Sequence, residues 1–205
     1  MRVPKSFKEV TVEQYQEILP IYLKDKEGID TWVNIIAILC DCQNEDIEGL
    51  PIGELKSIIK SLGWLVNNKF HPYKRKYVWL NGRLHKATFN AEDFNTAQFH
   101  EVETWLTRGD SVKQLHNLLA SIYSPFTWRG FVYSGKGHAE RAKAFKKKSV
   151  GKLYPTVFFY SKAYKDYTKR IAISGIKEAK KQLRIADKLL AQTLKEDLES
   201  IGVGT

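Results

Sequence analysis

The dipeptide Asn81-Gly82 predicts a tight turn between two short extended runs, YVWL and RLH. In the first run aromatic residues alternate with aliphatic ones, which is the period of a half-buried β-strand. Both positions of a two-residue hairpin turn favour positive φ, and Asn and Gly tolerate this better than other residues. We therefore predict a β-hairpin near residues 76–87.

Apolar residues before this hairpin recur at the spacing of α-helices. Thr11 and Gln14 have the spacing of a capping box, so a first helix is expected to begin near Thr11. Pro20 is expected to end or kink that helix, because proline lacks an amide proton and clashes with the preceding turn. Asp30 or Thr31 is expected to cap the second helix.

More helices are expected on both sides of the hairpin. The segment NEDIEGLP is expected to form a short helical turn, and a helix is expected after Pro51 with Gly63 at its end. Asn95 or Thr96 is expected to cap a helix through TWL. Asp110 is expected to cap the next helix, with Pro125 as its stop.

The C-terminal third is also expected to be helical. The segment LYPTVFFYSKAYKDYTKRIAIS favours a helix, although its aromatic content also permits a strand. The last segment carries the clearest amphipathic stripe, ended by Gly202 and formed by Ile176, Ala179, Leu183, Ala186, Leu190, Leu194, Leu198 and Ile201. The expected fold is mainly α (α+β), with helical bundle-like units, one hairpin and a long amphipathic C-terminal helix.

Charge divides the chain unevenly. Residues 1–66 carry 7 basic and 11 acidic residues, whereas residues 67–205 carry 26 and 12, so the net charges are −4 and +14. We expect an acidic N-terminal helical unit over 1–66 and a basic unit over 67–205 that contains the hairpin and later helices, or one continuous domain. Such asymmetry suggests a surface that faces nucleic acid, or two complementary surfaces that meet in an assembly.

Motifs of catalysis and cofactor binding are missing from the sequence. SGKGHAE lacks the span and the hydroxyl residue of a phosphate-binding loop, and no histidine pair has metal-ligand spacing on a helix. Cys40 and Cys42 are expected to be reduced and partly buried. We therefore expect no catalytic residue, cofactor or metal. No window of about 18 apolar residues occurs, so a soluble intracellular protein without membrane contact is expected.

The basic stretch RGFVYSGKGHAERAKAFKKKSVGK is the strongest candidate binding segment. Its glycines are expected to form the turn before a helix that begins near His138, and Trp128 and Tyr133 are candidates for stacking on bases. The alternative without a binding role is a helix whose charges are solvated. The candidate contacts to DNA or to an acidic partner are Arg141, Lys143, Lys146, Lys147, Lys148 and Lys152.

Several blocks of the sequence resemble proteins of tailed bacteriophages. The segments FKEVTVEQYQEILPIY and DTWVNIIAILCDCQNEDIEGLPIGELKSIIKSLGWL resemble the N-terminal part of tail-assembly-chaperone and virion-accessory proteins. The blocks FNTAQFHEVETWL, HNLLASIYSPF and TVFFYS are similar to those of related phage structural-gene products, where an aromatic hairpin precedes them. The likeness spans most of the chain and implies a morphogenesis or virion protein, not an enzyme. The long basic C-terminal part departs from a minimal tail chaperone.

The resemblance and the charge division together favour a non-enzymatic structural protein of a phage particle. We expect a subunit of a homo-oligomeric ring or connector at the head–tail junction, located in the virion and, during assembly, in the host cytoplasm. A tail assembly chaperone and a sequence-tolerant nucleic-acid-binding protein are the alternatives. The candidate assembly anchors, which intramolecular packing would equally explain, are Tyr154, Phe158, Phe159, Tyr164, Leu190 and Leu194.

Overall fold

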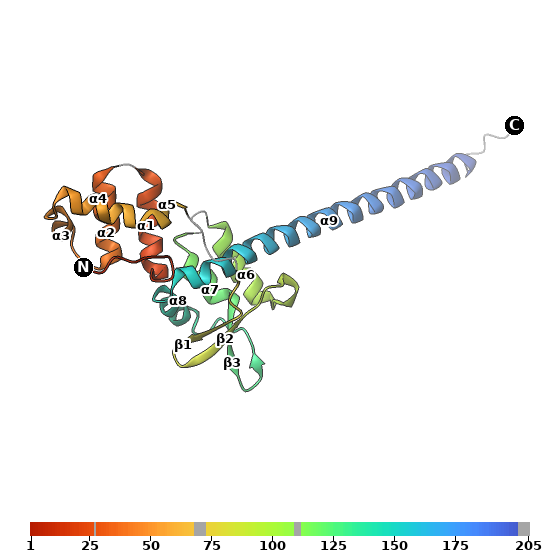
Figure 1. The fold of residues 1–205 in the computed structure, drawn as a ribbon. Coiled ribbons are helices and arrows are strands. Elements are labelled where there is room, and N and C mark those ends of the chain that lie inside the picture. The colour runs from red at the N-terminus through yellow and green to blue at the C-terminus, as the bar shows by residue number, and fades with distance from the viewer. Residues whose placement is uncertain (27, 68–72, 109–111, 201–205) are drawn as a thin grey trace. The chain divides into compact units, whose positions relative to one another are not determined.

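The computed structural model describes residues 1–26, 28–67, 73–108 and 112–200. Its internal contacts divide the chain into two compact units, Met1–Ala163 and Tyr164–Thr205. The boundary expected after residue 66 therefore falls inside the first unit. The chain is mainly helical with a small antiparallel sheet, which confirms the expected fold class (Figure 1).

Helices α1 (Val12–Lys24) and α2 (Ile29–Cys40) pack against each other in the first unit. The predicted capping box is confirmed, because the Gln14 amide donates to Thr11 Oγ1 at 3.1 Å and the Thr11 amide donates to Gln14 Oε1 at 3.0 Å. Pro20 does not end α1, which continues to Lys24. Burial of apolar residues such as Ile18 offsets the one hydrogen bond that Pro20 cannot donate.

Three short helices follow: α3 (Asn44–Glu48), α4 (Ile52–Ser61) and α5 (Gly63–Asn67). The helical turn after α2 was predicted correctly, but two boundaries were not. Gly28 precedes α2 as its cap in place of Asp30 or Thr31, and Gly63 begins α5 whereas Leu62 caps α4. The Gly28 amide donates to Asp25 Oδ1 at 3.0 Å, so the side chain that follows α1 holds the residue that precedes α2.

The sheet has four antiparallel strands in the order β1 (Tyr77–Leu80), β2 (Arg83–Ala87), β3 (Tyr123–Thr127) and β4 (Gly130–Phe131). The hairpin of β1 and β2 is confirmed, with φ of 48° at Asn81 and 74° at Gly82. Pro125 was expected to stop a helix, but it lies within β3 opposite His85. The chain leaves its helix earlier, at Ile122, because the next residues pair with β2.

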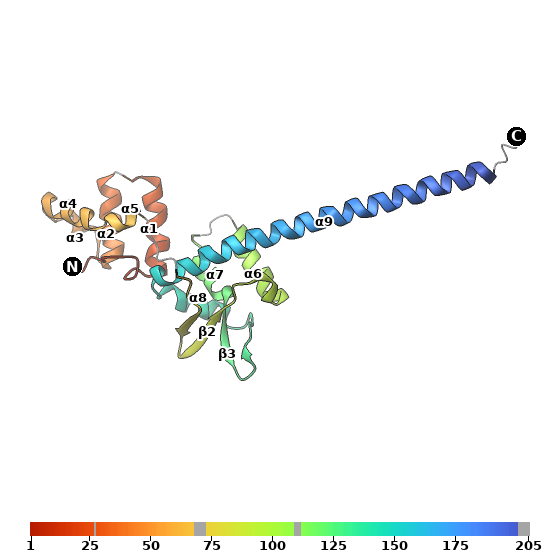
Figure 2. The same cartoon turned by 45° about the vertical axis from the view of Figure 1, so that its right-hand side comes forward.

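Further elements of this unit are η1 (Ala91–Asp93), α6 (Thr96–Thr107), α7 (Leu115–Ile122) and α8 (His138–Lys146). Asn95 caps α6 as predicted, since its Oδ1 accepts from the Gln98 amide at 2.8 Å. Asp110 lies outside the described residues, and Gln114 precedes α7. Helices α7 and α8 lie against each other and against the sheet (Figure 2).

Helix α9 (Val150–Ser200) begins in the first unit and is tied there to the N-terminal segment. The Val12 amide donates to the Lys148 carbonyl at 2.8 Å, and the Val150 amide donates to the Val10 carbonyl at 2.9 Å. A two-residue bridge between Thr11 and Ser149 joins the same segments. The start of α1 and the start of α9 thus hold each other in place.

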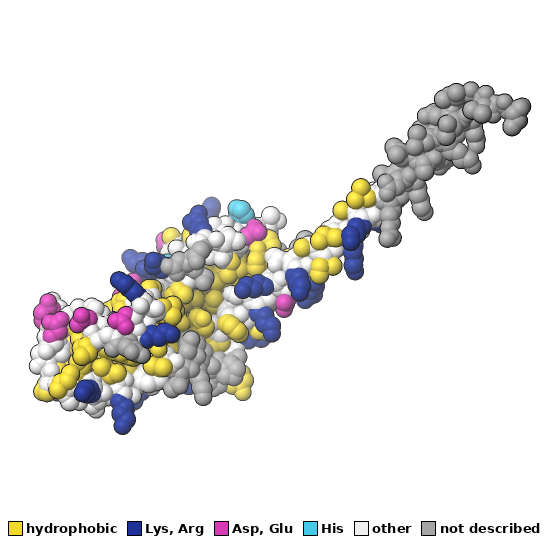
Figure 3. Space-filling model, turned by 90° about the horizontal axis from the view of Figure 1, so that it is seen from above, with side chains coloured by type: hydrophobic (Ala, Val, Ile, Leu, Met, Phe, Trp, Pro, Cys, Tyr) yellow, Lys and Arg dark blue, Asp and Glu magenta, His cyan; other side chains and the backbone are white. Residues whose placement is uncertain are grey.

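The helix of the second unit carries exposed apolar side chains. Ile173, Ile176 and Leu183 are 45%, 57% and 64% exposed. In Figure 3 yellow apolar side chains lie along this helix among dark blue Lys and Arg side chains. The described part of the predicted stripe is therefore open to solvent within this unit.

Candidate functional site

One face of the small sheet presents aromatic and basic side chains to solvent. Residues that pair across antiparallel strands project to the same side, and so do residues two apart along a strand. The register therefore gathers one set of side chains, called the sheet face from here on: Tyr77, Trp79, Leu84, Lys86, Ser124, Phe126 and Phe131.

The rings of the sheet face contact one another and nearby cations. Phe131 lies 5.9 Å from Tyr77 and 5.1 Å from Phe126 between ring centroids. Lys86 Nζ is 5.6 Å from the Phe131 centroid, and Lys76 Nζ is 5.6 Å from the Tyr77 centroid. The face is thus an ordered cluster of rings flanked by ammonium groups.

The turn between β3 and β4 extends this surface. Trp128 is 86% exposed, and the guanidinium carbon of Arg129 lies 4.4 Å from its ring centroid. Thr127 Oγ1 accepts from the Arg129 amide at 3.2 Å and donates to the Gly130 carbonyl at 2.9 Å. These bonds hold the turn that displays Trp128.

All the charges of the sheet region have one sign. Residues 73–89 and 123–137, which contain the four strands and their turns, carry seven Lys or Arg residues and no Asp or Glu. The seven are Lys74, Arg75, Lys76, Arg83, Lys86, Arg129 and Lys136. A surface of this composition attracts anionic partners and repels cationic ones.

The opposite face of the sheet is packed into the first unit. Val78, Leu80 and Ala87 are buried there, and so is His85. His85 Nδ1 donates to the Arg83 carbonyl at 3.1 Å, and burial lowers the pKa of His85, which favours the neutral ring that this packing requires. The exposed rings therefore stand on a fixed support.

The structure separates Arg141 from the basic side chains with which it was grouped. Arg141 is 7% exposed, and its guanidinium donates to the carbonyls of Ala120 at 3.3 Å, Lys136 at 3.0 Å and Ser134 at 3.0 Å. The expectation that Arg141 contacts DNA or an acidic partner is thus corrected. Its donors serve the backbone of the loop before α8, because an uncompensated guanidinium is too costly to bury.

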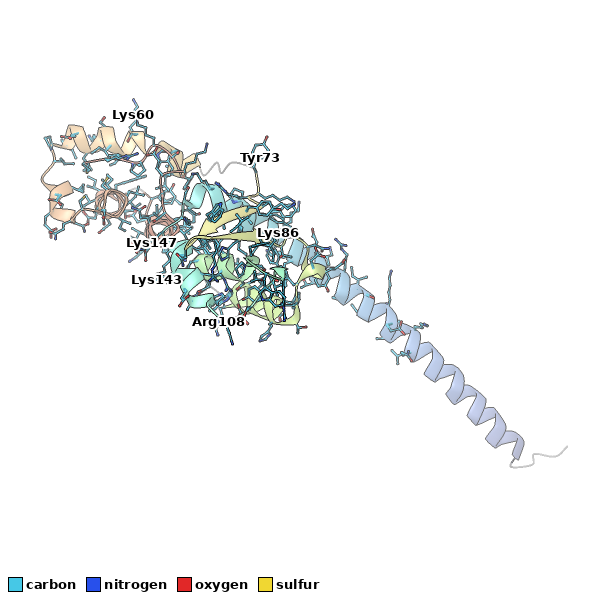
Figure 4. All side chains as sticks on the ribbon, turned by 90° about the horizontal axis from the view of Figure 1, so that it is seen from below. Lys60, Tyr73, Lys86, Arg108, Lys143 and Lys147 are labelled. Atoms are coloured by element: carbon cyan, nitrogen blue, oxygen red, sulfur yellow. The ribbon has the colours of Figure 1, made fainter. Side chains whose placement is uncertain are left out.

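The lysines of this region differ in exposure and in pairing. Lys143 and Lys147 are exposed and point away from α8 (Figure 4), and Lys152 is exposed on α9. Lys146 Nζ pairs with Glu13 Oε1 at 3.2 Å, and Lys148 is half-buried. Lys143, Lys147 and Lys152 remain available to a partner, whereas Lys146 is engaged within the first unit.

The aromatic residues expected to be assembly anchors have different surroundings. Phe158 and Phe159 are 64% and 40% exposed, and Lys74 Nζ lies 3.8 Å from the Phe159 centroid. Tyr154 packs on Tyr15 with ring centroids 5.6 Å apart, and Tyr164 is buried. Tyr154 is half-buried and packs within the first unit. The side chains of two further residues, Leu190 and Leu194, lie outside the described part.

A half-buried polar cluster joins α6, α7 and α8. His138 Nε2 lies 3.1 Å from Ser121 Oγ and 3.5 Å from Glu101 Oε2, and the Tyr133 hydroxyl donates to the same carboxylate. Serine and carboxylate approach one nitrogen, whereas a catalytic triad places them on opposite ring nitrogens. Ser121 is also fully buried. The geometry suits a structural network.

The described ranges hold neither a metal-binding cluster nor a thiol activated by its surroundings. These ranges contain no group of three or more His, Cys, Asp or Glu side chains placed to hold a metal ion. Cys40 and Cys42 are free and half-buried, and burial raises the pKa of both thiols. Over the same residues, no helix combines the length and the apolar character needed to cross a membrane.

Sequence reasoning missed the sheet face, because it predicted only one of the two hairpins. The signal was present in SPFTWRGF, where Gly130 follows an aromatic run and adopts a φ of 89°. The sequence pattern predicts a helix stop at Pro125 and a turn at the later glycines, so it does not place Phe126 on the same face as Trp79.

Comparisons with known proteins give no family assignment. No protein-family model, curated protein sequence or solved structure matches this chain.

Proposed function

We propose that this chain is a non-enzymatic structural protein of a tailed-phage particle, a ring or connector subunit at the head–tail junction that acts through protein contacts. The blocks that resemble phage morphogenesis proteins support this proposal. The observation that carries it is the exposed apolar stripe on the helix of the second unit.

The stripe has the spacing of a helix–helix interface. Ile176 and Leu183 are seven residues apart, two helical turns, and Ile173 lies one turn before Ile176. In proteins a helix gains most of its stability from packing its apolar face, and all three side chains are exposed within the second unit. A helix from another copy or from a neighbouring subunit would cover them.

The positive charge of residues 164–183 favours a partner helix that carries acidic residues. Residues 164–183 carry six Lys or Arg and two Asp or Glu. Two copies that met in parallel over this stretch would repel each other, whereas carboxylates on a partner would pair with the flanking lysines. The basic part of the chain thus acts through complementarity inside an assembly.

The polar cluster around His138 supports binding over catalysis. A serine nucleophile must reach a substrate carbonyl, and the Ser121 hydroxyl has no exposed surface. The cluster also makes its contacts to the backbone, since His138 Nε2 lies 3.2 Å from the Asn117 carbonyl. Its groups therefore satisfy one another.

Mass spectrometry of purified particles tests the particle role directly. We expect the chain at stoichiometric abundance in virions and in tail-less head intermediates. Abundance during infection with absence from finished particles would overturn the structural role in favour of a tail assembly chaperone.

A pair of variants tests the stripe. Leu183→Glu places a carboxylate on the stripe, and we expect it to abolish incorporation into particles. Gln182→Glu adds the same charge at the neighbouring exposed position and serves as the matched control. Equal incorporation of the two variants would show that the stripe is not the interface.

A further inference from the structure

We propose that the sheet face binds single-stranded nucleic acid, with bases stacked on its exposed rings and phosphates paired with the surrounding Lys and Arg side chains. The inference does not rest on the proposed assembly role, because that role uses the helix of the second unit. The two proposals therefore fail independently.

The exposed rings match the apolar part of such a ligand. Trp79, Phe126 and Tyr77 are 62%, 55% and 42% exposed. Four of the seven members of the sheet face are aromatic, Leu84 alone is aliphatic, and Ser124 is buried. Planar rings stack on the face of any nucleobase. Aromatic rings also serve protein interfaces, so the choice between the two ligands depends on the charge around the rings.

The charges match the polyanionic part. The seven Lys and Arg residues of the sheet region have no carboxylate among them, and three of their side chains lie beside rings of the sheet face or of the turn between β3 and β4. Those three are Lys76, Lys86 and Arg129. Cations within one side-chain length of a stacking ring suit nucleotides, in which each base is followed by a phosphate.

The platform is held in place before any ligand binds. The Tyr123 hydroxyl donates to the Arg75 carbonyl at 2.5 Å, and the Arg75 amide donates to Thr156 Oγ1 at 2.9 Å. These bonds fix the segment that enters β1 to β3 and to α9. A rigid surface loses little conformational entropy on binding, so the rings need no reordering to accept bases.

The same features exclude a duplex as the preferred ligand. In a duplex the base faces are covered by their neighbours, so the rings would find only backbone and edges. The sheet face also lacks Asn, Gln, Asp and Glu side chains that read base edges by hydrogen bonding. Binding is therefore selective for single strands and tolerant of sequence.

Fluorescence anisotropy of the full chain with a labelled oligothymidylate of about 20 nucleotides tests the proposal. We expect binding at low salt that weakens by at least about tenfold between about 50 and 200 mM salt. Trp79→Ala and Phe126→Ala should each weaken binding by about tenfold, since each removes one stacking surface. Both side chains are exposed, so circular dichroism should show an unchanged fold.

Controls separate this surface from other candidates. Phe158→Ala removes an equally exposed ring outside the sheet, and the double variant Lys143→Ala/Lys147→Ala removes charge from α8. Both should retain affinity within about twofold. Absence of binding at low salt would overturn the proposal, as would unchanged affinity in Trp79→Ala or tighter binding of the matching duplex. Preferential binding of polyglutamate would assign the surface to an acidic protein partner instead.

Discussion

Gly151 lies directly against the backbone of Phe7, and its amide donates to the Phe7 carbonyl at 2.9 Å. A Cβ added to Gly151 would come within 2.5 Å of the Phe7 carbonyl carbon and 2.7 Å of the Lys8 nitrogen. The contact joins the N-terminal segment to the first turn of α9. This turn of the helix therefore has room for glycine alone.

Gly151→Ala is expected to lower the free energy of unfolding by about 1–3 kcal/mol, because backbone atoms must move to admit the methyl group. Helix propensity alone predicts the opposite sign, since Ala is favoured over Gly inside a helix. Chemical denaturation followed by circular dichroism measures the change. Gly53→Ala in α4, where a Cβ meets nothing within 4 Å, is the control and should be neutral or stabilising. A Gly151→Ala protein as stable as wild type would contradict the close contact.

Gly82→Ala tests the turn of the first hairpin. Gly82 has a φ of 74° and open space around it, so any cost comes from the backbone conformation and not from a clash. We expect a loss of about 1–2 kcal/mol in the free energy of unfolding, the cost of left-handed backbone for a residue with a Cβ. Asn81→Gly relieves the same constraint at the neighbouring position and should be nearly neutral. Equal stability of Gly82→Ala and wild type would argue against this turn.

Local signals in the sequence account for the parts of the fold that were predicted. The Thr11 capping box, the Asn95 cap and the Asn81-Gly82 turn each depend on atoms a few residues apart. Pairing of β2 with β3 joins residues some 40 positions apart, such as His85 and Pro125, and no local pattern encodes it. Without that pairing, Pro125 was taken for a helix stop and the aromatic face could not be assembled.

Arg141 illustrates the same limit for the candidate site. It lies in a segment rich in lysine, which includes Lys143 and Lys146–Lys148, so composition placed it in a basic patch. The helical period turns Arg141 inward together with Ala142 and Phe145, and it meets carbonyls that the sequence could not locate. Lys143, Lys147 and Lys152 of the same candidate set are exposed, and their contact with DNA or an acidic partner stays a prediction.

Arg141→Met is expected to destabilise the first unit by about 1–3 kcal/mol, because it retains the apolar stem but leaves the carbonyls of Ser134, Lys136 and Ala120 without their donor. Lys143→Met removes the same charge from an exposed position of α8 and should change stability by no more than about 0.5 kcal/mol. Thermal denaturation of the two proteins gives the comparison. Similar melting temperatures would mean that Arg141 is not structural.

Stability is expected to fall as the pH is lowered, because three histidines are packed as neutral rings. Burial lowers the pKa of His85, His116 and His138 below the ordinary value of about 6.5. The unfolded chain therefore binds more protons below that pH. The contribution of the neutral rings to the free energy of unfolding is complete above about pH 6.5, and it is lost as the pH falls towards the pKa values of the histidines in the folded chain. Urea denaturation at pH values of about 7.5 and 5.5 measures the loss. His138→Gln should reduce this pH dependence, whereas His100→Gln, at an exposed position of α6, should retain it. A free energy of unfolding that is equal at both pH values would contradict the burial of these rings.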